Sequence, residues 1–346
     1  MARHIIRRLI QSIPTFFGIT LLSYMIMAAA PGGPAKLITF QTSTPESQNS
    51  DATRREIERL GLNDPWPIQY LSWLAGNDWM WWKGPVEERD PRAIRYGILR
   101  GDFGNSFFKK RPTMDMIGER LPASFELGVS SLIVALVLGV PLGIMSAIWR
   151  GSPFDNGTRV MAVVGNAIPN FWFGLILLLI FGSWLGWLPM GDRCDPLKYS
   201  RTPCPPVHQR LEHLILPTIV LAYGGVAGYS RYMRTAMLDT ISSDYVRTAR
   251  AKGLPPRAVW FRHAARNALI PLATFLGPAL VGVIGGAAIT ESIFTWPGLG
   301  RLFLESISAR DYPVIMASVV IGSILTVIAY IISDILYAVF DPRIRF

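Results

Sequence analysis

Hydrophobic and polar positions fall into long separate blocks along this chain of 346 residues. Six stretches contain no Asp, Glu, Lys or Arg: Leu9 to Ala30, Leu127 to Trp149, Val160 to Gly191, Leu214 to Ser230, Asn267 to Thr290 and Tyr312 to Ser333. Most of them exceed the roughly 20 apolar residues that cross about 30 Å of hydrocarbon as a helix. The fourth is shorter, but it can be extended through His213 or Tyr232. The pattern predicts an all-α polytopic membrane protein with six transmembrane helices.

Basic residues in the short connecting segments set the expected topology. Arg3, Arg7 and Arg8 precede the first span, and Arg343 and Arg345 follow the last. Short basic segments stay on the cytoplasmic side of a membrane, and six crossings place both termini on one side. We therefore expect both termini in the cytoplasm. The first span begins like a signal peptide, but it is long for one and five spans follow, so we expect it to be retained.

Composition agrees with a membrane protein rather than a nucleic-acid binder. Half of the residues are hydrophobic and 17% are charged, against about 25% in soluble domains. The net charge of +10 would suggest nucleic acid in a soluble protein. Here much of the excess lies in loops that orient the spans.

This topology divides the chain into four parts. Residues 1–30 are the cytoplasmic N-terminus and first span, 31–121 an extracytoplasmic segment, 122–340 the core with spans two to six, and 341–346 a cytoplasmic tail. The core includes a cytoplasmic loop at 237–268. The extracytoplasmic segment contains Trp73, Trp79, Trp81 and Trp82. Clustered Trp is typical of an interfacial belt, and a ligand-stacking surface is the alternative.

Proline and glycine recur inside the predicted spans. Pro141, Pro169, Pro217, Pro271 and Pro278 interrupt them, which membrane helices tolerate where neighbours or water-lined cavities satisfy the freed backbone groups. We therefore expect a packed bundle that contains a cavity. Gly282, Gly285 and Gly286 on the fifth span predict close helix contact.

Catalytic chemistry is missing from the sequence. No phosphate-binding loop, H-E-x-x-H or G-x-S-x-G motif occurs, so we expect no enzyme activity from this chain alone. Its four His residues are scattered over different regions, so we expect no metal site. If the chain moves a solute uphill, the energy must come from a partner or an ion gradient.

Acidic residues are candidates for gradient-driven transport when they lie within spans. Glu126, Glu212 and Glu291 lie at span ends, where we expect water to reach them. Asp334 lies deeper in the sixth span, and a helix cap, a pairing with a neighbouring helix or a proton relay would explain it. No chain of acids at mid-bilayer depth appears, which weakens the case for a gradient-driven carrier.

Two cysteines, Cys194 and Cys204, both fall in the extracytoplasmic loop between the third and fourth spans. An oxidising compartment permits a disulfide between them. Two independent thiols are the alternative, since a sequence does not give the Cα separation.

The most basic loop follows the fourth span, from Tyr245 to Pro271. Eight basic residues lie between positions 231 and 266: Arg231, Arg234, Arg247, Arg250, Lys252, Arg257, Arg262 and Arg266. The pattern predicts a helix from Asp239 to Lys252, ended by Gly253, and a second from Arg257 onward. Gly253 adopts positive φ easily, and Pro255-Pro256 blocks continuation. This punctuation favours a docking helix over a loop that only contacts anionic lipid.

Several motifs in order resemble the inner-membrane permease subunits of ABC-type importers, in the dipeptide/oligopeptide/nickel branch. They are RHIIRRLIQSIPTFFGIT (3–20), GDFGNS (101–106), RLPASFELG (120–128), PLGIMSA (141–147), AIPNFWFG (167–174), DYVRTARAKGL (244–254), ESIFTWPGLGRL (291–302), ARDYP (309–313) and DPRIR (341–345). The resemblance covers almost the whole chain, and it implies a location in a bacterial or archaeal plasma (inner) membrane. Residues 76–95, rich in Trp, look like an insertion relative to the compact family pattern.

The resemblance implies a type I importer permease fold and a set of partners. These are a second permease, two cytoplasmic ATPases that hold ATP and Mg, and an extracytoplasmic solute-binding protein; no cofactor is implied on this chain. The family's coupling helix, which docks on an ATPase, maps onto Asp244, Tyr245, Arg247, Thr248, Ala249, Arg250, Ala251, Lys252, Gly253 and Leu254. Arg247 and Thr248 depart from the general E-A-A-x-x-x-G pattern, while Ala249 and Gly253 match it.

The expected function is import of di- or oligopeptides by alternating access, driven by the partner ATPases. The same machine carrying nickel chelates, glutathione or oligosaccharides remains an alternative, since the binding protein largely sets selectivity. A gradient-driven secondary transporter is a more remote one.

Overall fold

The computed structural model describes residues 2–29, 61, 64–80, 83–89, 91, 94–195, 204–272, 275, 279–283 and 286–340. Within these ranges the regular elements are helical, and the chain forms two compact units. The first comprises Met1–Arg8, Arg120–Leu302 and Leu325–Phe346, and the second Leu9–Glu119 and Phe303–Ile324. The expected cytoplasmic tail at 341–346 lies outside the described residues. So do residues 31–60 of the expected extracytoplasmic segment.

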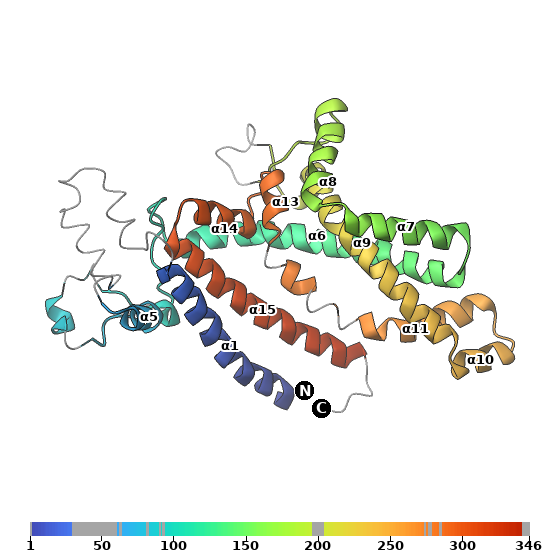
Figure 1. Ribbon diagram of the computed structural model, residues 1–346, viewed down its shortest axis with the longest axis horizontal. Coiled ribbons are helices and arrows are strands. Elements are labelled where there is room, and N and C mark those ends of the chain that lie inside the picture. Colours follow the sequence, from blue (N-terminus) through green and yellow to red (C-terminus); the bar gives the residue numbers. More distant parts are fainter. Residues whose placement is uncertain are drawn as a thin grey trace. The chain divides into compact units, whose positions relative to one another are not determined.

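Four long helices are apolar enough to cross a membrane, among the residues described. They are α1 (Ala2–Ala29), α6 (Thr113–Ile148), α9 (Leu211–Ile241) and α15 (Tyr312–Phe340) (Figure 1). At its 36 residues, α6 extends about 54 Å, well beyond about 30 Å of hydrocarbon. These helices correspond to the first, second, fourth and sixth predicted spans.

The third predicted span is bent rather than straight. It consists of α7 (Pro153–Ala167) and α8 (Asn170–Leu177), which continues as a π-helical segment (Leu178–Trp184), and the two parts meet at 101°. Ile168 is extended, with ψ of 123°, because the residue before a proline avoids the α region. The Val164 carbonyl near the end of α7 accepts the Ile168 N–H at 3.1 Å and also the Tyr223 hydroxyl of α9 at 3.0 Å.

The fifth predicted span is described only in pieces. These are α11 (Ala265–Ala268), a 3₁₀ turn (Ile270–Leu272), residues 275 and 279–283, and α13 (Ala288–Ile293). Residues 273–274, 276–278 and 284–285 lie outside the described part of the chain. A continuous fifth helix therefore stays a prediction.

Two glycines let α6 and α9 approach closely. A Cβ added at Gly143 would lie 2.4 Å from the Ser230 carbonyl oxygen, and one at Gly139 would lie 3.0 Å from that of Val226. Small residues four positions apart are the usual means of close helix contact in membranes. Larger residues here would separate the two helices.

The glycines expected to make such contacts on the fifth span behave differently from one another. A Cβ added at Gly286 would lie 2.8 Å from the Gly300 backbone nitrogen, so close contact is confirmed there. At Gly282 an added Cβ would meet no described atom within 4 Å, so the prediction is wrong at that position. Gly285 lies outside the described residues.

An aromatic core holds the second unit together. Tyr24 of α1 lies 5.6 Å from Tyr70 and 5.7 Å from Trp73, ring centroid to centroid, and the latter two belong to α5 (Trp66–Ala75). Trp73 is 5% exposed and is therefore a core residue rather than part of an interfacial belt. Trp79 is 41% exposed and donates its indole N–H to the Gly76 carbonyl, while Trp81 and Trp82 lie outside the described residues.

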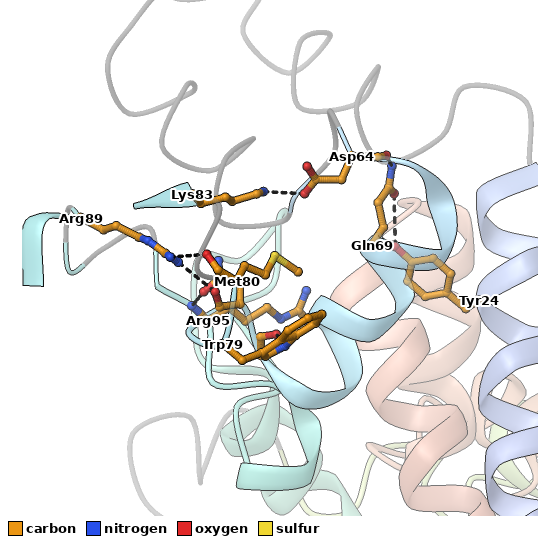
Figure 2. Close-up of polar contacts among 10 residues, drawn as sticks. Tyr24, Asp64, Gln69, Trp79, Met80, Lys83, Arg89 and Arg95 are labelled. Atoms are coloured by element: carbon orange, nitrogen blue, oxygen red, sulfur yellow. Dashed lines mark hydrogen bonds and ion pairs between the residues drawn. The ribbon is translucent and has the colours of Figure 1, made fainter. Parts of the chain in front are cut away.

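Asn77 and Arg95, at the two ends of a loop, are hydrogen-bonded to each other. The Asn77 N–H donates to the Arg95 carbonyl at 2.9 Å, and the Arg95 N–H donates to Asn77 Oδ1 at 2.9 Å. The Arg89 guanidinium donates to the Met80 carbonyl (Figure 2) and also to the carbonyls of Asn77 and Gly84. One arginine side chain thus binds three backbone carbonyls. We call this segment the 77–95 loop.

Two sequence motifs meet in the second unit. Asp311, in ARDYP, accepts hydrogen bonds from the Phe107 N–H at 2.9 Å and from the Ser106 hydroxyl, in GDFGNS. Asp311 is 3% exposed, so its carboxylate is satisfied by these buried donors. The remaining short elements are Val86–Glu88, Ile98–Arg100, Val207–Gln209 and α14 (Leu299–Ser308).

Candidate functional site

The helix α10 (Asp244–Ala251) contains most of the predicted coupling residues. It is shorter than the helix predicted from Asp239 to Lys252, because α9 continues to Ile241 and the chain turns at Ser242 and Ser243. The Ser242 hydroxyl donates to the Asp239 carbonyl and the Ser243 hydroxyl to that of Thr240. Such local bonds compete with helix continuation, and together with the extended Ser243 (ψ 151°) they separate α9 from α10.

One face of α10 is buried and the other is exposed. Val246 is 0% and Ala249 6% exposed, whereas Tyr245 is 43% exposed. The other predicted coupling residues are also exposed: Asp244, Arg247, Thr248, Arg250, Ala251, Lys252, Gly253 and Leu254. The exposed face is polar and basic, which suits contact with another protein.

The buried face of α10 packs into an apolar core that we call the platform core. Its buried members are Ile144 and Ala147 of α6, Met233 and Met237 of α9, Val246 and Ala249 of α10, Val259 and Ala264 of the π-helical segment Ala258–Ala264, and Ala265 and Ala268 of α11. Because interiors are close-packed and resist compression, a force on α10 acts on the ends of α6 and α9 together.

The end of α10 has the hydrogen bonds of a Schellman motif. The Gly253 N–H donates to the Arg250 carbonyl at 2.9 Å and the Leu254 N–H to that of Ala249 at 3.4 Å. Gly253 has φ of +73°, the left-handed conformation that this motif requires and that glycine adopts readily. The sequence prediction that the helix ends at Gly253 is confirmed.

Arg250 is held by the chain itself. Its guanidinium carbon lies 4.6 Å from the centroid of the Trp260 ring, a cation–π contact. Among the described residues, Arg247 makes only a long pair with Asp244, at 3.7 Å between highly exposed side chains, which contributes little. Of these two basic residues, Arg247 is the more available to a partner.

A buried ion pair links the spans next to the platform core. Asp155 of α7 is 1% exposed and accepts two hydrogen bonds from the Arg234 guanidinium of α9, at 2.6 and 2.8 Å. It also accepts from the Ser146 hydroxyl of α6 at 2.5 Å and from the Gly151 N–H at 3.0 Å. We call this group the Asp155 clamp, and it joins three helices.

Sequence reasoning missed the Asp155 clamp. The sequence pattern groups Arg234 with the basic loop, yet Arg234 lies inside α9. The available signal was Ser152-Pro153-Phe154-Asp155, since Ser before Pro with an acid in the first turn predicts a helix start. The Ser152 hydroxyl does accept the Asp155 N–H, but the pattern does not reveal the partner on α9.

The loop between α8 and α9 carries both cysteines and a second buried charge cluster. Cys194 and Cys204 form a disulfide with a Cα–Cα distance of 5.9 Å. Glu126 of α6 accepts from Arg193 at 2.7 Å and from Arg210 at 2.8 Å. Burial lowers the pKa of the Arg210 guanidinium, the Arg193 charge acts in the same direction, and Glu126 opposes both.

The acidic residues expected to be reached by water are mostly buried. The Glu126 side chain is 9% exposed and Glu291 is 0% exposed, whereas Glu212 is exposed as predicted. The expectation was wrong for the first two because loops close over the span ends. Asp334 pairs with Arg8 of α1, at 2.8 Å, as the pairing hypothesis predicts.

Known protein families match this chain over most of its length. Residues 139–346 match the family described as "Binding-protein-dependent transport system inner membrane component", and residues 1–128 match the N-terminal component of the same systems. The chain is 44% identical to the oligopeptide transport system permease protein AppB of Bacillus subtilis (strain 168), over 100% of both chains. It is 35% identical to the di/tripeptide transport system permease protein DppB of Pseudomonas aeruginosa (strain UCBPP-PA14), over 100% of this chain and 99% of that one.

The fold is similar to that of a solved importer. A structure described as inward facing conformations of the MetNI methionine ABC transporter matches with a TM-score of 0.52 at 16% identity, over 66% of this chain and 98% of that chain. This likeness concerns the fold alone, and it agrees with the type I importer permease fold expected from the sequence. With matches that together cover nearly the whole length, the chain belongs to the inner membrane components of binding-protein-dependent transport systems.

Proposed function

We propose that this chain is a translocation subunit of an ATP-driven importer for di- and oligopeptides, working by alternating access. The observation that carries the proposal is the mounting of α10, which exposes a polar face and buries Val246 and Ala249 in the platform core. The peptide cargo is supported by the relatives, which are oligopeptide, di/tripeptide and dipeptide permeases.

In this mechanism α10 receives force from a cytoplasmic ATPase. Closure of an ATPase pair on ATP would push or pull the exposed face of α10, and the platform core would pass that displacement to α6 and α9. The Asp155 clamp would carry it on to α7, since it ties α7 to α9 by two charge-assisted bonds. Reorientation of these helices would expose the cargo path alternately to the two sides.

The proposal requires partners and one orientation. A second permease would complete the path, two ATPases would bind ATP and Mg, and a solute-binding protein would deliver the peptide. This chain would hold no cofactor and catalyse no reaction itself. Both termini and α10 would lie in the cytoplasm, and the 77–95 loop outside.

Reconstitution tests the function directly. The complete importer in proteoliposomes should take up Ala-Ala-Ala only with ATP present, and vanadate should stop uptake. Omitting the ATPases should abolish uptake, and a proton or sodium gradient should not replace ATP. Uptake by this chain alone, or driven by a gradient, would contradict the proposal.

Labelling tests the orientation. A single cysteine at Arg247 should react with a membrane-impermeant thiol reagent only in inverted vesicles, since its side chain is exposed on α10. The matched background replaces Cys194 and Cys204 by Ser. Reaction from the outer face of intact cells would place α10 on the wrong side of the membrane.

We further propose that the 77–95 loop meets the solute-binding protein. Because the Asn77 and Arg95 backbones bond to each other at 2.9 Å, replacing Asp78–Ile94 by a short glycine linker leaves the loop ends in place. Affinity for the binding protein and uptake should both fall. Unchanged affinity and uptake would exclude this role and leave the transport function standing.

A further inference from the structure

A groove of about 460 Å³ lies in the second unit, between the end of α1 and the start of α15. Its volume falls within the range of sites that hold small molecules, commonly about 300–1,000 Å³. Most of its lining is apolar and comes from two helices: Ser23, Ile26 and Met27 of α1, and Ile315, Met316 and Val319 of α15. Ile26 is 72% exposed, so the groove is open to the surroundings.

The floor of the groove is part of the aromatic core of the second unit. Met316 is 2% exposed and belongs to the same buried cluster as Tyr24 and Trp73, with Met27 packed against that cluster. Tyr312, which also lines the groove, is 8% exposed. Because a close-packed interior resists deformation, the groove keeps its shape without a ligand and is preorganised for one.

Arg310 is the charged residue among those that line the groove, all of them described. Its side chain is exposed, so a ligand in the groove can reach it, and an arginine guanidinium stays protonated in proteins. The neighbouring carboxylate of Asp311 is 3% exposed, does not line the groove, and accepts hydrogen bonds from Ser106 and Phe107. The groove therefore combines apolar walls with a positive charge.

The backbone at Arg310 is one that glycine adopts more readily. The end of α14 has the hydrogen bonds of a Schellman motif, since the Asp311 N–H donates to the Ser306 carbonyl at 2.8 Å and the Arg310 N–H to that of Ile307 at 3.0 Å. Arg310 has φ of +53°, and glycine is usual at this position because a Cβ makes the left-handed conformation costly. The turn itself therefore gives no reason for an arginine, and the side chain must account for it.

The charge and the apolar walls follow the order of a membrane surface. Arg310 lies two residues before α15 begins, whereas Val319 lies seven residues after its first residue, about 10 Å farther along the helix axis. A phospholipid has the same order, with its phosphate at the surface and its acyl chains beneath. The planar guanidinium matches a phosphate with two parallel hydrogen bonds. A flexible acyl chain also fits an irregular groove, whereas a helix, about 10–12 Å across, would enter it only with single side chains.

From this arrangement we infer that the groove is a binding site for an anionic phospholipid. The lipid phosphate pairs with Arg310, and one acyl chain lies in the groove between α1 and α15. The bound lipid holds the end of α1 against α15. The inference rests on the membrane placement of these two helices and not on the peptide cargo, so either proposal can fail without the other.

Photolabelling of the complete importer in proteoliposomes tests the site. Phosphatidylglycerol with a photoreactive acyl chain, present as a small fraction in phosphatidylcholine, should label residues 23–27 and 315–319. In Arg310→Gly this labelling should fall about fivefold, the effect of one basic residue on an anionic lipid. Arg310→Lys keeps the charge without the planar fork and should retain part of the labelling.

Lys110→Gly is the matched control. Lys110 is exposed, has φ of +52° and does not line the groove, so this variant makes the same changes of charge and backbone elsewhere in the second unit. Its labelling should equal that of wild type. Glycine relieves left-handed strain but adds entropy to the unfolded chain, so both glycine variants should unfold near the wild-type temperature in phosphatidylcholine. Added phosphatidylglycerol should raise that temperature less in Arg310→Gly than in wild type or Lys110→Gly.

Equal labelling of wild type by photoreactive phosphatidylcholine and phosphatidylglycerol would overturn the inference, since it would show ordinary contact with the bilayer. Unchanged labelling in Arg310→Gly would overturn it as well. No label in the groove of the complete importer would mean that the second permease or another part of the complex covers it. Competition by inorganic phosphate would indicate a site for the free anion, and it too would overturn the lipid assignment.

Discussion

The α10 region and the 77–95 loop are both polar surfaces, yet they are held in opposite ways. The exposed face of α10 is carried by apolar side chains packed underneath, among them Val246 and Ala249. The 77–95 loop is held by polar bonds to its own backbone, chiefly from Arg89. A close-packed apolar core transmits a displacement to the helices packed against it, whereas hydrogen bonds at the surface are readily exchanged for bonds to water. The comparison indicates that α10 is built to pass on force and the loop to present a shape.

The largest effect is expected at the Asp155 clamp beside the platform core. Asp155→Ala leaves the Arg234 charge part-buried without its partner, and breaking a buried ion pair costs about 3–5 kcal/mol. Thermal unfolding of the purified complex should shift strongly downward, with loss of uptake. The double variant Asp155→Leu with Arg234→Met should recover much of the stability, since an apolar pair leaves no unpaired charge. If the single variant were as stable as wild type, the clamp would not join these helices.

A smaller effect is expected where α10 meets the platform core. Val246→Asp puts a carboxylate where the exposed fraction is 0%, and α10 can avoid burying it by leaving the core. The cost is then limited to lost apolar burial, about 1.5–3 kcal/mol. ATPase copurification should fall while the unfolding temperature changes little. Val246→Ile, which keeps an apolar side chain, is the control, and normal copurification with Val246→Asp would separate α10 from ATPase binding.

The turn after α10 should tolerate substitution according to backbone conformation rather than space. At Gly253 an added Cβ meets no described atom within 4 Å, but φ is +73°. Left-handed conformation costs L-residues roughly 1–2 kcal/mol and Asn less. Uptake should therefore decrease in the order wild type, Gly253→Asn, Gly253→Val. Equal activity of the Asn and Val variants would show that the Schellman end of α10 does not matter for coupling.

The smallest effect is expected in the 77–95 loop. Arg89→Ala frees three carbonyls, but Arg89 is only half-buried and water can replace it, so the loss is about 1 kcal/mol. Limited proteolysis should cut faster within the loop, with little change in global unfolding temperature. Arg89→Lys should rescue only part of this resistance, because one ammonium does not match the planar fork. A large drop in global stability would mean that the loop supports the fold as well as its own shape.

The sequence predicted features whose determinants are local. The four long spans follow from uninterrupted apolar stretches, and the end of α10 follows from Gly253 and the prolines after it. The bend at Ile168 could also have been predicted from the sequence, since Pro169 restricts the backbone conformation of the residue before it. Uniform hydrophobicity across Val160 to Gly191 concealed it.

The features that escaped prediction depend on residues far apart in the chain. Asp155 meets Arg234 across 79 positions, and Ser124 meets Glu291 across 167. Neither spacing has a period that sequence patterns could detect. The burial of Glu126 and Glu291 escaped for the same reason, because it depends on how loops close over the span ends. The family resemblance supplied the coupling residues, but it did not indicate which of them face the core.

The bond from Tyr223 to the Val164 carbonyl has a consequence for biogenesis. The third crossing is interrupted at Pro169, which has no N–H to donate, and the lipid interior has no water to take its place. Tyr223 adds a second donor to the Val164 carbonyl beside this break, and it belongs to α9, which emerges from the ribosome later than α7 and α8. A nascent chain should therefore keep its third crossing beside the translocon, shielded from acyl chains, until α9 arrives to complete it.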